Sequence, residues 1–416
     1  MLDPRRGFVT VVLLVATFTQ CGRPTPDAGT PAQPPTYTEV LAEIDRDIAF
    51  WSERSEREPR LWLARTRLAD EFLRRARLTG DFDDYAAAQQ AIARAFDQAP
   101  VGAGPFLSRA RLHFALHRLD GAESDLQAEQ RRVVMDDRLR AAIVGMRADL
   151  AFHRGQYEAA LSGYRESLRL HRSVDGLCRL AHYQWKTGDF DGAEATYDAA
   201  EGELRGPAPM LRAWFDMQRG LLDLERGRWD EALSHYRNAG EDMSGWWLID
   251  EHIAEVYALR GEREHARAMY IDLVARTGNP EFMSALAVLV EDEEGLDWFR
   301  RARAAYEQRM AVFPEAALGH ALEYAILARD PRAVAWAERN HRLRSGGEAC
   351  VLLARAYHSV GADERARDVI ETVLATPYRA ATLYAAATTV YDALGDRTRA
   401  AASAASARAI NPAALD

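Results

Sequence analysis

Residues 151–164 have the sequence AFHRGQYEAALSGY, and three later segments repeat its pattern: QWKTGDFDGAEATY at 184–197, DLERGRWDEALSHY at 223–236 and YALRGEREHARAMY at 257–270. Each segment has a glycine at its fifth position, an alanine five residues after the glycine and a tyrosine nine residues after it. Successive glycines are 33, 39 and 34 residues apart. A near-constant period of this length indicates a stack of structural repeats rather than a set of unrelated domains.

The glycine and the alanine of each copy have separate physical roles. A residue just past a helix end often takes a left-handed conformation, which costs glycine nothing. The alanine predicts a point where two antiparallel helices cross, because a small side chain lets the backbones approach closely. Two further copies follow later in the chain, and the repeat-defining residues are Gly155, Ala160, Gly188, Ala193, Gly227, Ala232, Gly261, Ala266, Gly361, Ala366, Gly395 and Ala400.

This pattern resembles that of the tetratricopeptide repeat family, over roughly residues 60–412. The clearest copies lie at 141–280 and 347–412. The resemblance implies an all-α fold, a right-handed α-solenoid of about nine or ten helix pairs. It also implies that the first helix of each pair lines a concave groove.

Weaker copies fill the gaps between the clear ones. In one of them Asp297 occupies the glycine position, with Ala302 and Tyr306 in register behind it. The others lie at 68–100, 106–129 and 316–344. Ahead of the array, Thr36 and Glu39 have the spacing of a capping box, so we expect a leading helix within 36–59 and the solenoid over 60–416.

The first 35 residues differ from the rest. Residues 1–20 have a basic start and a short apolar run, which predicts an export signal rather than a membrane-spanning helix. Cys21 follows, and 21–35 is rich in Pro, Thr and Gly, as expected of an extended tether. This order is similar to that of a bacterial lipoprotein precursor, which implies that Cys21 is lipidated and that the protein is anchored in the cell envelope, on its periplasmic or extracellular side. The alternative is an incidental cysteine in a cleaved secretory signal.

Composition excludes several classes of function. The chain has 416 residues and a formal net charge of −10, which argues against binding duplex nucleic acid. Lys186 is the only lysine and follows Trp185, so the chain has no phosphate-binding Gly-Lys-Ser/Thr loop.

No arrangement of residues predicts catalysis, a cofactor or a metal ion. His113 and His117 have the i, i+4 spacing of two ligands on one helix face, but the pattern offers no third ligand, and His252 with Glu255 is similarly incomplete. The acidic run 291–294 lacks the spacing of a calcium loop and is interpreted as a solvated turn. We therefore predict a protein that is not an enzyme.

If the family geometry holds, a set of first-helix side chains faces the groove. They combine aromatic or methionine surface with polar groups, a composition that suits recognition of a protein or peptide partner. These groove candidates are Asp149, Phe152, His153, His182, Trp185, Lys186, Trp214, Met217, Leu221, Glu225, Glu251, Glu255, Arg355 and His358.

The sequence thus predicts a non-catalytic protein-interaction scaffold of the bacterial cell envelope. Two alternatives stay open: an all-α solenoid that cleaves or binds cell-wall glycan, and a cytoplasmic regulator of the same repeat class. The last predicted helix, 398–410, has no following helix to cover it, so a homodimer through the C-terminal repeat is a further expectation.

Overall fold

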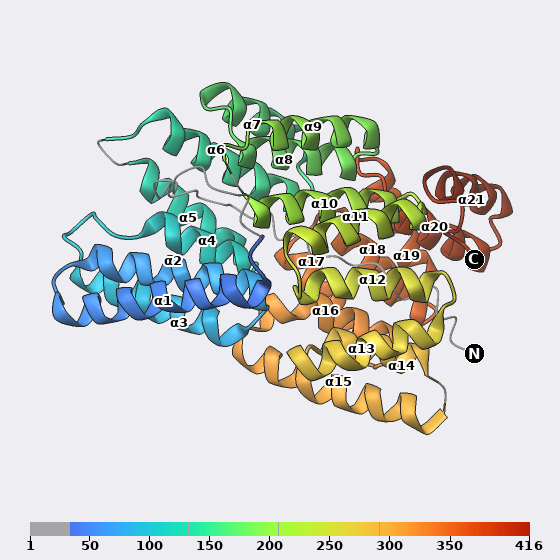
Figure 1. Cartoon of the computed structure of the whole chain (residues 1–416). Helices are drawn as coiled ribbons and strands as arrows, with labels where there is room; N and C mark the ends of the chain where they lie inside the picture. The colour runs from blue at the N-terminus through green and yellow to red at the C-terminus, as the bar shows by residue number, and fades with distance from the viewer. Residues whose placement is uncertain (1–33, 132–133, 207, 291) are drawn as a thin grey trace.

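The structure, a computed structural model, describes residues 34–131, 134–206, 208–290 and 292–416. Within these ranges the chain forms 21 α-helices and no strand (Figure 1). No helix among the described residues has the length and apolar character needed to cross a bilayer. The predicted signal 1–20, Cys21 and most of the 21–35 tether lie outside the described ranges.

One leading helix precedes ten antiparallel helix pairs. The leading helix is α1 (Tyr37–Arg57). The pairs are α2 (Trp62–Thr79) with α3 (Phe82–Gln98), α4 (Phe106–Ala115) with α5 (Leu119–Gln130), α6 (Asp137–His153) with α7 (Tyr157–Leu170), α8 (Val174–Lys186) with α9 (Phe190–Gly202), α10 (Pro209–Glu225) with α11 (Trp229–Asp242), α12 (Trp247–Leu259) with α13 (Arg263–Thr277), α14 (Pro280–Leu289) with α15 (Asp292–Val312), α16 (Pro314–Leu327) with α17 (Ala333–Leu343), α18 (Gly347–Ser359) with α19 (Asp363–Leu374), and α20 (Ala381–Ala393) with α21 (Arg397–Ile410). The expected all-α solenoid of tetratricopeptide-like helix pairs is confirmed.

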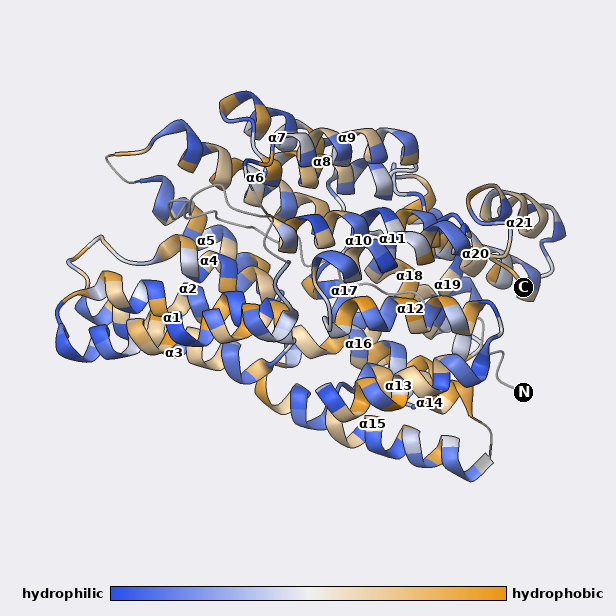
Figure 2. Ribbon diagram, viewed as in Figure 1, coloured by the Kyte–Doolittle hydropathy of each residue, from blue (hydrophilic) through white to orange (hydrophobic). Residues whose placement is uncertain are grey.

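The repeat-defining residues occupy the predicted positions. The six glycines named above have φ between 71° and 85° at the turns between the paired helices. The alanines five residues later are buried, and so are Tyr164, Tyr197, Tyr236 and Tyr270 on the second helices. Apolar residues lie along one side of most helices, so each pair has a face that only its neighbours can cover (Figure 2).

The crossing between α10 and α11 depends on a glycine. A Cβ atom placed on Gly220 would lie 2.3 Å from Cε1 of Tyr236, well inside van der Waals contact. Gly220 therefore leaves room for the ring of Tyr236, which packs directly against the backbone of α10. Other first helices have alanine at this position, for example Ala181 and Ala254, and α20 has Thr388.

One weak copy differs from the prediction. Asp297 is not at a turn but inside α15, because that helix begins at Asp292. From residue 292 onward the acidic run is therefore helical rather than a solvated turn, and Glu293 and Glu294 lie in the first turn of α15, where negative charge is favourable at the positive end of the helix dipole. Ala302 and Tyr306 are nevertheless buried as expected.

Non-glycine residues take the turn conformation in two other copies. His117 has φ 56° and Arg329 has φ 53°, both in the left-handed region. Because α4 ends at Ala115, His113 and His117 do not share a helix face, and the i, i+4 pair expected from the sequence is wrong. His113 instead contacts Asp125, with 3.1 Å between Nδ1 and Oδ2.

The leading helix begins with the expected capping box. The backbone N–H of Thr36 donates to Oε2 of Glu39 at 2.8 Å, and the backbone N–H of Glu39 donates to Oγ1 of Thr36 at 3.2 Å. The backbone N–H of Tyr37 donates to the Ser244 carbonyl at 2.9 Å, which joins α1 to the loop between α11 and α12.

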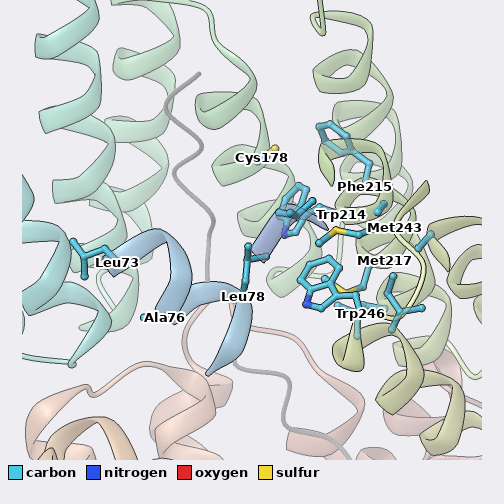
Figure 3. Close-up of a cluster of buried hydrophobic side chains, with 14 of the residues drawn as sticks. Leu73, Ala76, Leu78, Cys178, Trp214, Phe215, Met217, Met243 and Trp246 are labelled. Atoms are coloured by element: carbon cyan, nitrogen blue, oxygen red, sulfur yellow. The ribbon is translucent and has the colours of Figure 1, made fainter. Parts of the chain in front are cut away.

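The array curls so that its later repeats touch its earlier ones (Figure 1). Nε1 of Trp247, on α12, donates to the carbonyl of Leu78, near the end of α2, at 2.9 Å. Leu78 belongs to one continuous core with Trp214 on α10 and Trp246 before α12 (Figure 3). The first repeat is therefore buried against the fifth and sixth, far from it in sequence.

The helix crossing at Gly220 gives a stability prediction. Gly220→Ala should lower the unfolding free energy by about 1–3 kcal/mol, because the added methyl group must displace the ring of Tyr236. Gly240→Ala on the partner helix is the matched control, since nothing lies within 4 Å of the Cβ position there. It should be neutral or stabilising by up to about 1 kcal/mol. Thermal unfolding of the two variants, followed by circular dichroism, tests this prediction. Equal shifts in melting temperature would contradict the proposed crossing.

Candidate functional site: the turn-to-turn interface

The inner ends of three first helices meet two later segments of the chain. We call this contact the turn-to-turn interface: His153, Lys186 and Glu225 at the ends of α6, α8 and α10 on one side, and segments 344–348 and 376–381 on the other. Both segments are loops that continue into the start of a later first helix, α18 or α20.

Segment 344–348 binds the end of α6 through its backbone. The N–H of Gly346 donates to the carbonyl of His153 at 2.9 Å. The N–H of Gly347 donates to the hydroxyl of Tyr157 at 2.8 Å in a buried position. A Cβ on Gly347 would lie 2.3 Å from the ring of Tyr378, so this position requires glycine for lack of space.

Segment 376–381 binds the ends of α8 and α10 in the same manner. The N–H of Arg379 donates to the carbonyl of Lys186 at 2.9 Å. The N–H of Ala381, at the start of α20, donates to Oε1 of Glu225 at 2.9 Å. Since the first N–H groups of a helix have no partner within the helix, Glu225 acts as a cap supplied by a distant repeat.

Aromatic side chains fill the space between these polar contacts. Phe152, Tyr157 and Tyr164 share one buried cluster with Tyr378. The rings of Tyr157 and Tyr378 lie 6.2 Å apart. The later repeats add apolar residues to the same cluster, among them Cys350, Val351, Val373 and Leu383.

The interface encloses two small cavities that share Glu348, Leu352 and Tyr378 in their walls. Their volumes are about 30 Å³ and 60 Å³, enough for one or a few water molecules but far below the size of a ligand pocket. The interior of the turn-to-turn interface is therefore a packed contact between repeats.

One ion pair crosses the interface. Nζ of Lys186 lies 2.9 Å from Oε1 of Glu348, whose side chain is 42% exposed. Burial raises the pKa of Glu348, but Lys186, together with His182 and His153, outweighs it and lowers that pKa to about 2. Both partners of this ion pair are therefore charged at neutral pH.

Two histidines of the interface are held neutral. Burial lowers the pKa of His153 to about 4, and the neighbouring Arg344 acts in the same direction. Burial also lowers the pKa of His182 to about 3, with Lys186 as the next cause. Protonating His153 would place a positive charge next to Arg344, and protonating His182 would place one next to Lys186.

The apolar groove candidates are core residues and do not line an open groove. Phe152, Trp185, Trp214, Met217 and Leu221 are between 2% and 7% exposed. They do lie on first helices, as expected, but the curled array covers them with its own residues. Here the structure corrects the expectation of an accessible aromatic surface.

The polar groove candidates separate into three groups. Lys186, Glu225 and Arg355 come together, with Glu348, around the larger cavity, and His153 lies at the smaller one. Asp149 pairs with Arg179 inside the array, at 2.8 Å between Oδ2 and Nε, and His182 is buried against Phe152 and Trp185. Glu251 and Glu255 lie on α12 next to His252, and His358 contacts Asp363 at 2.6 Å.

Sequence reasoning missed the second half of the interface. The run Ser345-Gly346-Gly347 has the composition of a linker between repeats, yet these residues dock on the end of α6. Glu348 and Tyr378 were not singled out at all. The available signal was the break in repeat pattern before each of these segments, a Ser-Gly-Gly run and Pro377 with Tyr378, but it does not say where a loop binds.

Comparison with known proteins agrees with the helix-pair architecture. The family model described as "Tetratricopeptide repeat" matches residues 349–382, which cover α18 and α19. No curated protein matches the chain.

Three solved structures illustrate the range of similar folds. Yeast Tom70 is 13% identical, with 89% of this chain and 87% of that one covered and a TM-score of 0.44. A tetratricopeptide repeat protein from Parabacteroides merdae is 20% identical, with 57% and 93% covered and a TM-score of 0.36. PilF from Pseudomonas aeruginosa is 19% identical, with 51% and 96% covered and a TM-score of 0.33.

The neutral histidines give a pH prediction. Their pKa is lower in the folded chain than the usual 6.5, so between about pH 6.5 and 4 the unfolded chain binds protons that the folded chain does not. Stability from this source is fully present above pH 6.5 and is lost as the pH falls. At pH 5 the loss should be roughly 2 kcal/mol for each histidine.

Melting temperatures measured from pH 7.5 to pH 5 test this. The double variant His153→Gln, His182→Gln should lose less stability on acidification than the unaltered protein. His171→Gln, at an exposed position, is the control and should keep the original slope. An unchanged slope in the double variant would show that acid acts elsewhere.

Proposed function

We propose that this protein is a non-catalytic protein-interaction scaffold of the bacterial cell envelope, and that it recognises a partner segment with the inner ends of α6, α8 and α10. In the structure described above, which we call the closed form, these helix ends hold the chain's own segments 344–348 and 376–381. The partner would take the place of one or both segments.

The observation that carries this proposal is the way in which the inner face holds polypeptide. A carbonyl at the end of α6, another at the end of α8 and the carboxylate of Glu225 each accept a backbone N–H from a loop segment. Backbone-directed hydrogen bonds with a few side-chain pockets are how proteins commonly bind extended peptides. The inner face therefore has the chemistry of peptide recognition, whatever segment occupies it.

The segments already bound indicate what a partner would look like. One contains two glycines followed by Glu348, which pairs with Lys186, and the other places Tyr378 among aromatic residues. A partner segment of this class is non-helical, has small residues that permit close approach, and carries an acidic and an aromatic side chain. Because the chain's own segments have a high effective concentration, binding shifts an equilibrium between closed and open arrays.

The proposal of an envelope location rests on the sequence alone. A basic start, a short apolar run, Cys21 and a Pro-rich tether follow one another in the order of a lipoprotein precursor. The tether would separate the array from the membrane by a flexible stretch of chain. A lipid on Cys21 would keep the scaffold at the surface where its partner is found.

Variants that weaken the closed form test partner recognition. Glu348→Gln removes the charge that pairs with Lys186 and leaves the inner ends of α6, α8 and α10 unaltered, so segment 344–348 should become more sensitive to limited proteolysis. If a partner competes for this face, the variant should capture it in larger amounts after cross-linking in cells and mass spectrometry. Glu158→Gln, at an exposed position of α7, is the control and should behave like the unaltered chain.

Replacing Trp185 or Trp214 would be uninformative, because both are buried and their loss would unfold repeats. The scaffold proposal fails if no protein is enriched with either the unaltered chain or Glu348→Gln relative to a tag-only control. It also fails if the unaltered chain, Glu348→Gln and Glu158→Gln capture the same proteins in equal amounts, since the inner face would then be irrelevant to binding.

Lipidation has its own test. Cells expressing the protein should incorporate labelled palmitate into the unaltered chain and into Cys350→Ala, whose thiol is buried, but not into Cys21→Ala. Recovery of the unaltered protein in the cytosolic fraction, without label, would contradict the envelope proposal.

The proposed homodimer through α21 is tested by light scattering on the purified protein. A mass equal to that of the monomer would rule it out.

A further inference from the structure

Three side chains on α12 converge at one point. Nδ1 of His252 lies 3.0 Å from Oε2 of Glu251 and 3.5 Å from Oε2 of Glu255. The three ligand atoms all lie within 4.8 Å of one another. Zinc holds nitrogen and oxygen ligands at about 2.1 Å, which places two ligands of one ion about 3–3.5 Å apart. The two separations from Nδ1 of His252, 3.0 and 3.5 Å, match this spacing, and the third separation is at most 4.8 Å.

His252 is oriented by its surroundings but lacks a hydrogen bond. It is 1% exposed, and neither ring nitrogen has an aligned hydrogen-bond partner among the described residues. The carboxylate oxygens lie within ion-pair distance of Nδ1, yet off the N–H direction, on which a hydrogen bond depends. The ring of Tyr236, on α11, stacks on the imidazole with centroids 5.2 Å apart and fixes its plane.

The charge of this cluster is also unusual for the molecule. Three other buried acids pair with an arginine: Asp84 with Arg75, Asp125 with Arg109, and Asp149 with Arg179. Glu255 is 4% exposed, and within the described residues no arginine or lysine lies within 4 Å of it or of Glu251. With no guanidinium nearby, a cation placed between the two carboxylates would offset the cost of burying their charge.

We propose that Glu251, His252 and Glu255 form a binding site for one divalent transition-metal ion of the zinc class. One imidazole and two carboxylates suit zinc and its neighbours better than magnesium or calcium, which prefer oxygen ligands throughout. The side chain of Glu251 is 19% exposed, so solvent reaches the cluster and water can complete the coordination. This site lies outside the turn-to-turn interface and does not depend on the proposed function.

A proton is the competing occupant. Burial lowers the pKa of His252, but the two carboxylates outweigh it and raise that pKa to about 10. Without a metal ion, an imidazolium between two carboxylates would hold the site at neutral pH. The two occupants are distinguished by measuring metal binding directly.

The test uses the folded protein freed of metal with a chelator and titrated with Zn²⁺ at pH 7.5, by calorimetry and by thermal melting. We expect one equivalent of Zn²⁺ to bind and to raise the melting temperature, and Mg²⁺ to do neither. Glu251→Gln should weaken Zn²⁺ binding at least tenfold, as loss of a ligand requires. Its partial exposure means that this variant should fold, even if a His252 variant does not.

His265→Gln is the matched control. His265 lies 3.3 Å from Glu262 in the same helix pair, but its side chain is 75% exposed and no third ligand is near. This variant should bind Zn²⁺ as the unaltered protein does. The proposal is overturned if Zn²⁺ binds with no defined stoichiometry, or with equal affinity in the unaltered protein and Glu251→Gln. Either result would leave the proton as the occupant.

Discussion

The close approach of paired helices at small residues is the constraint on which the rest of the structure depends. At Gly220 the backbone of α10 lies against the ring of Tyr236, and alanines serve the same purpose in the neighbouring pairs. This spacing fixes the angle within each pair. Because each pair is stacked on the next in the same manner, the angle accumulates along the array. The curl that brings α12, α18 and α20 against the inner ends of α2, α6 and α10 is the sum of these local crossings.

Much of the architecture could be predicted from the sequence, because the same residues recur at the same positions in each repeat. Gly155 and Ala160 each have one structural role, and both roles recur at a fixed period, so even a degenerate copy could be placed. The prediction failed where a copy departs from the rule without a visible marker. Asp297 was placed at a turn because Ala302 and Tyr306 stand in register behind it, yet α15 begins at Asp292 and includes it.

The interior of the array could not be predicted for a different reason. Trp185 and Trp214 were correctly assigned to first helices, but the period of a repeat contains no information about what lies opposite it. Whether an inward side chain meets solvent, a partner or another part of the chain depends on the accumulated curl, to which every pair contributes. Gly347 shows the limit most clearly, since its requirement for glycine comes from Tyr378, 31 residues later in the sequence and in another repeat.

The turn-to-turn interface adds contacts between repeats that are distant in the array, and these contacts constrain the number of repeats. In an open solenoid each unit touches only its neighbours, so evolution can lengthen or shorten the array by whole units with little effect on the others. Here segment 344–348 must meet the end of α6, and Ala381 must meet Glu225. Insertion or loss of a single repeat between them would move every one of these contacts out of register at once. The number of repeats in this chain is therefore fixed by its geometry, as the number of strands is fixed in a closed barrel.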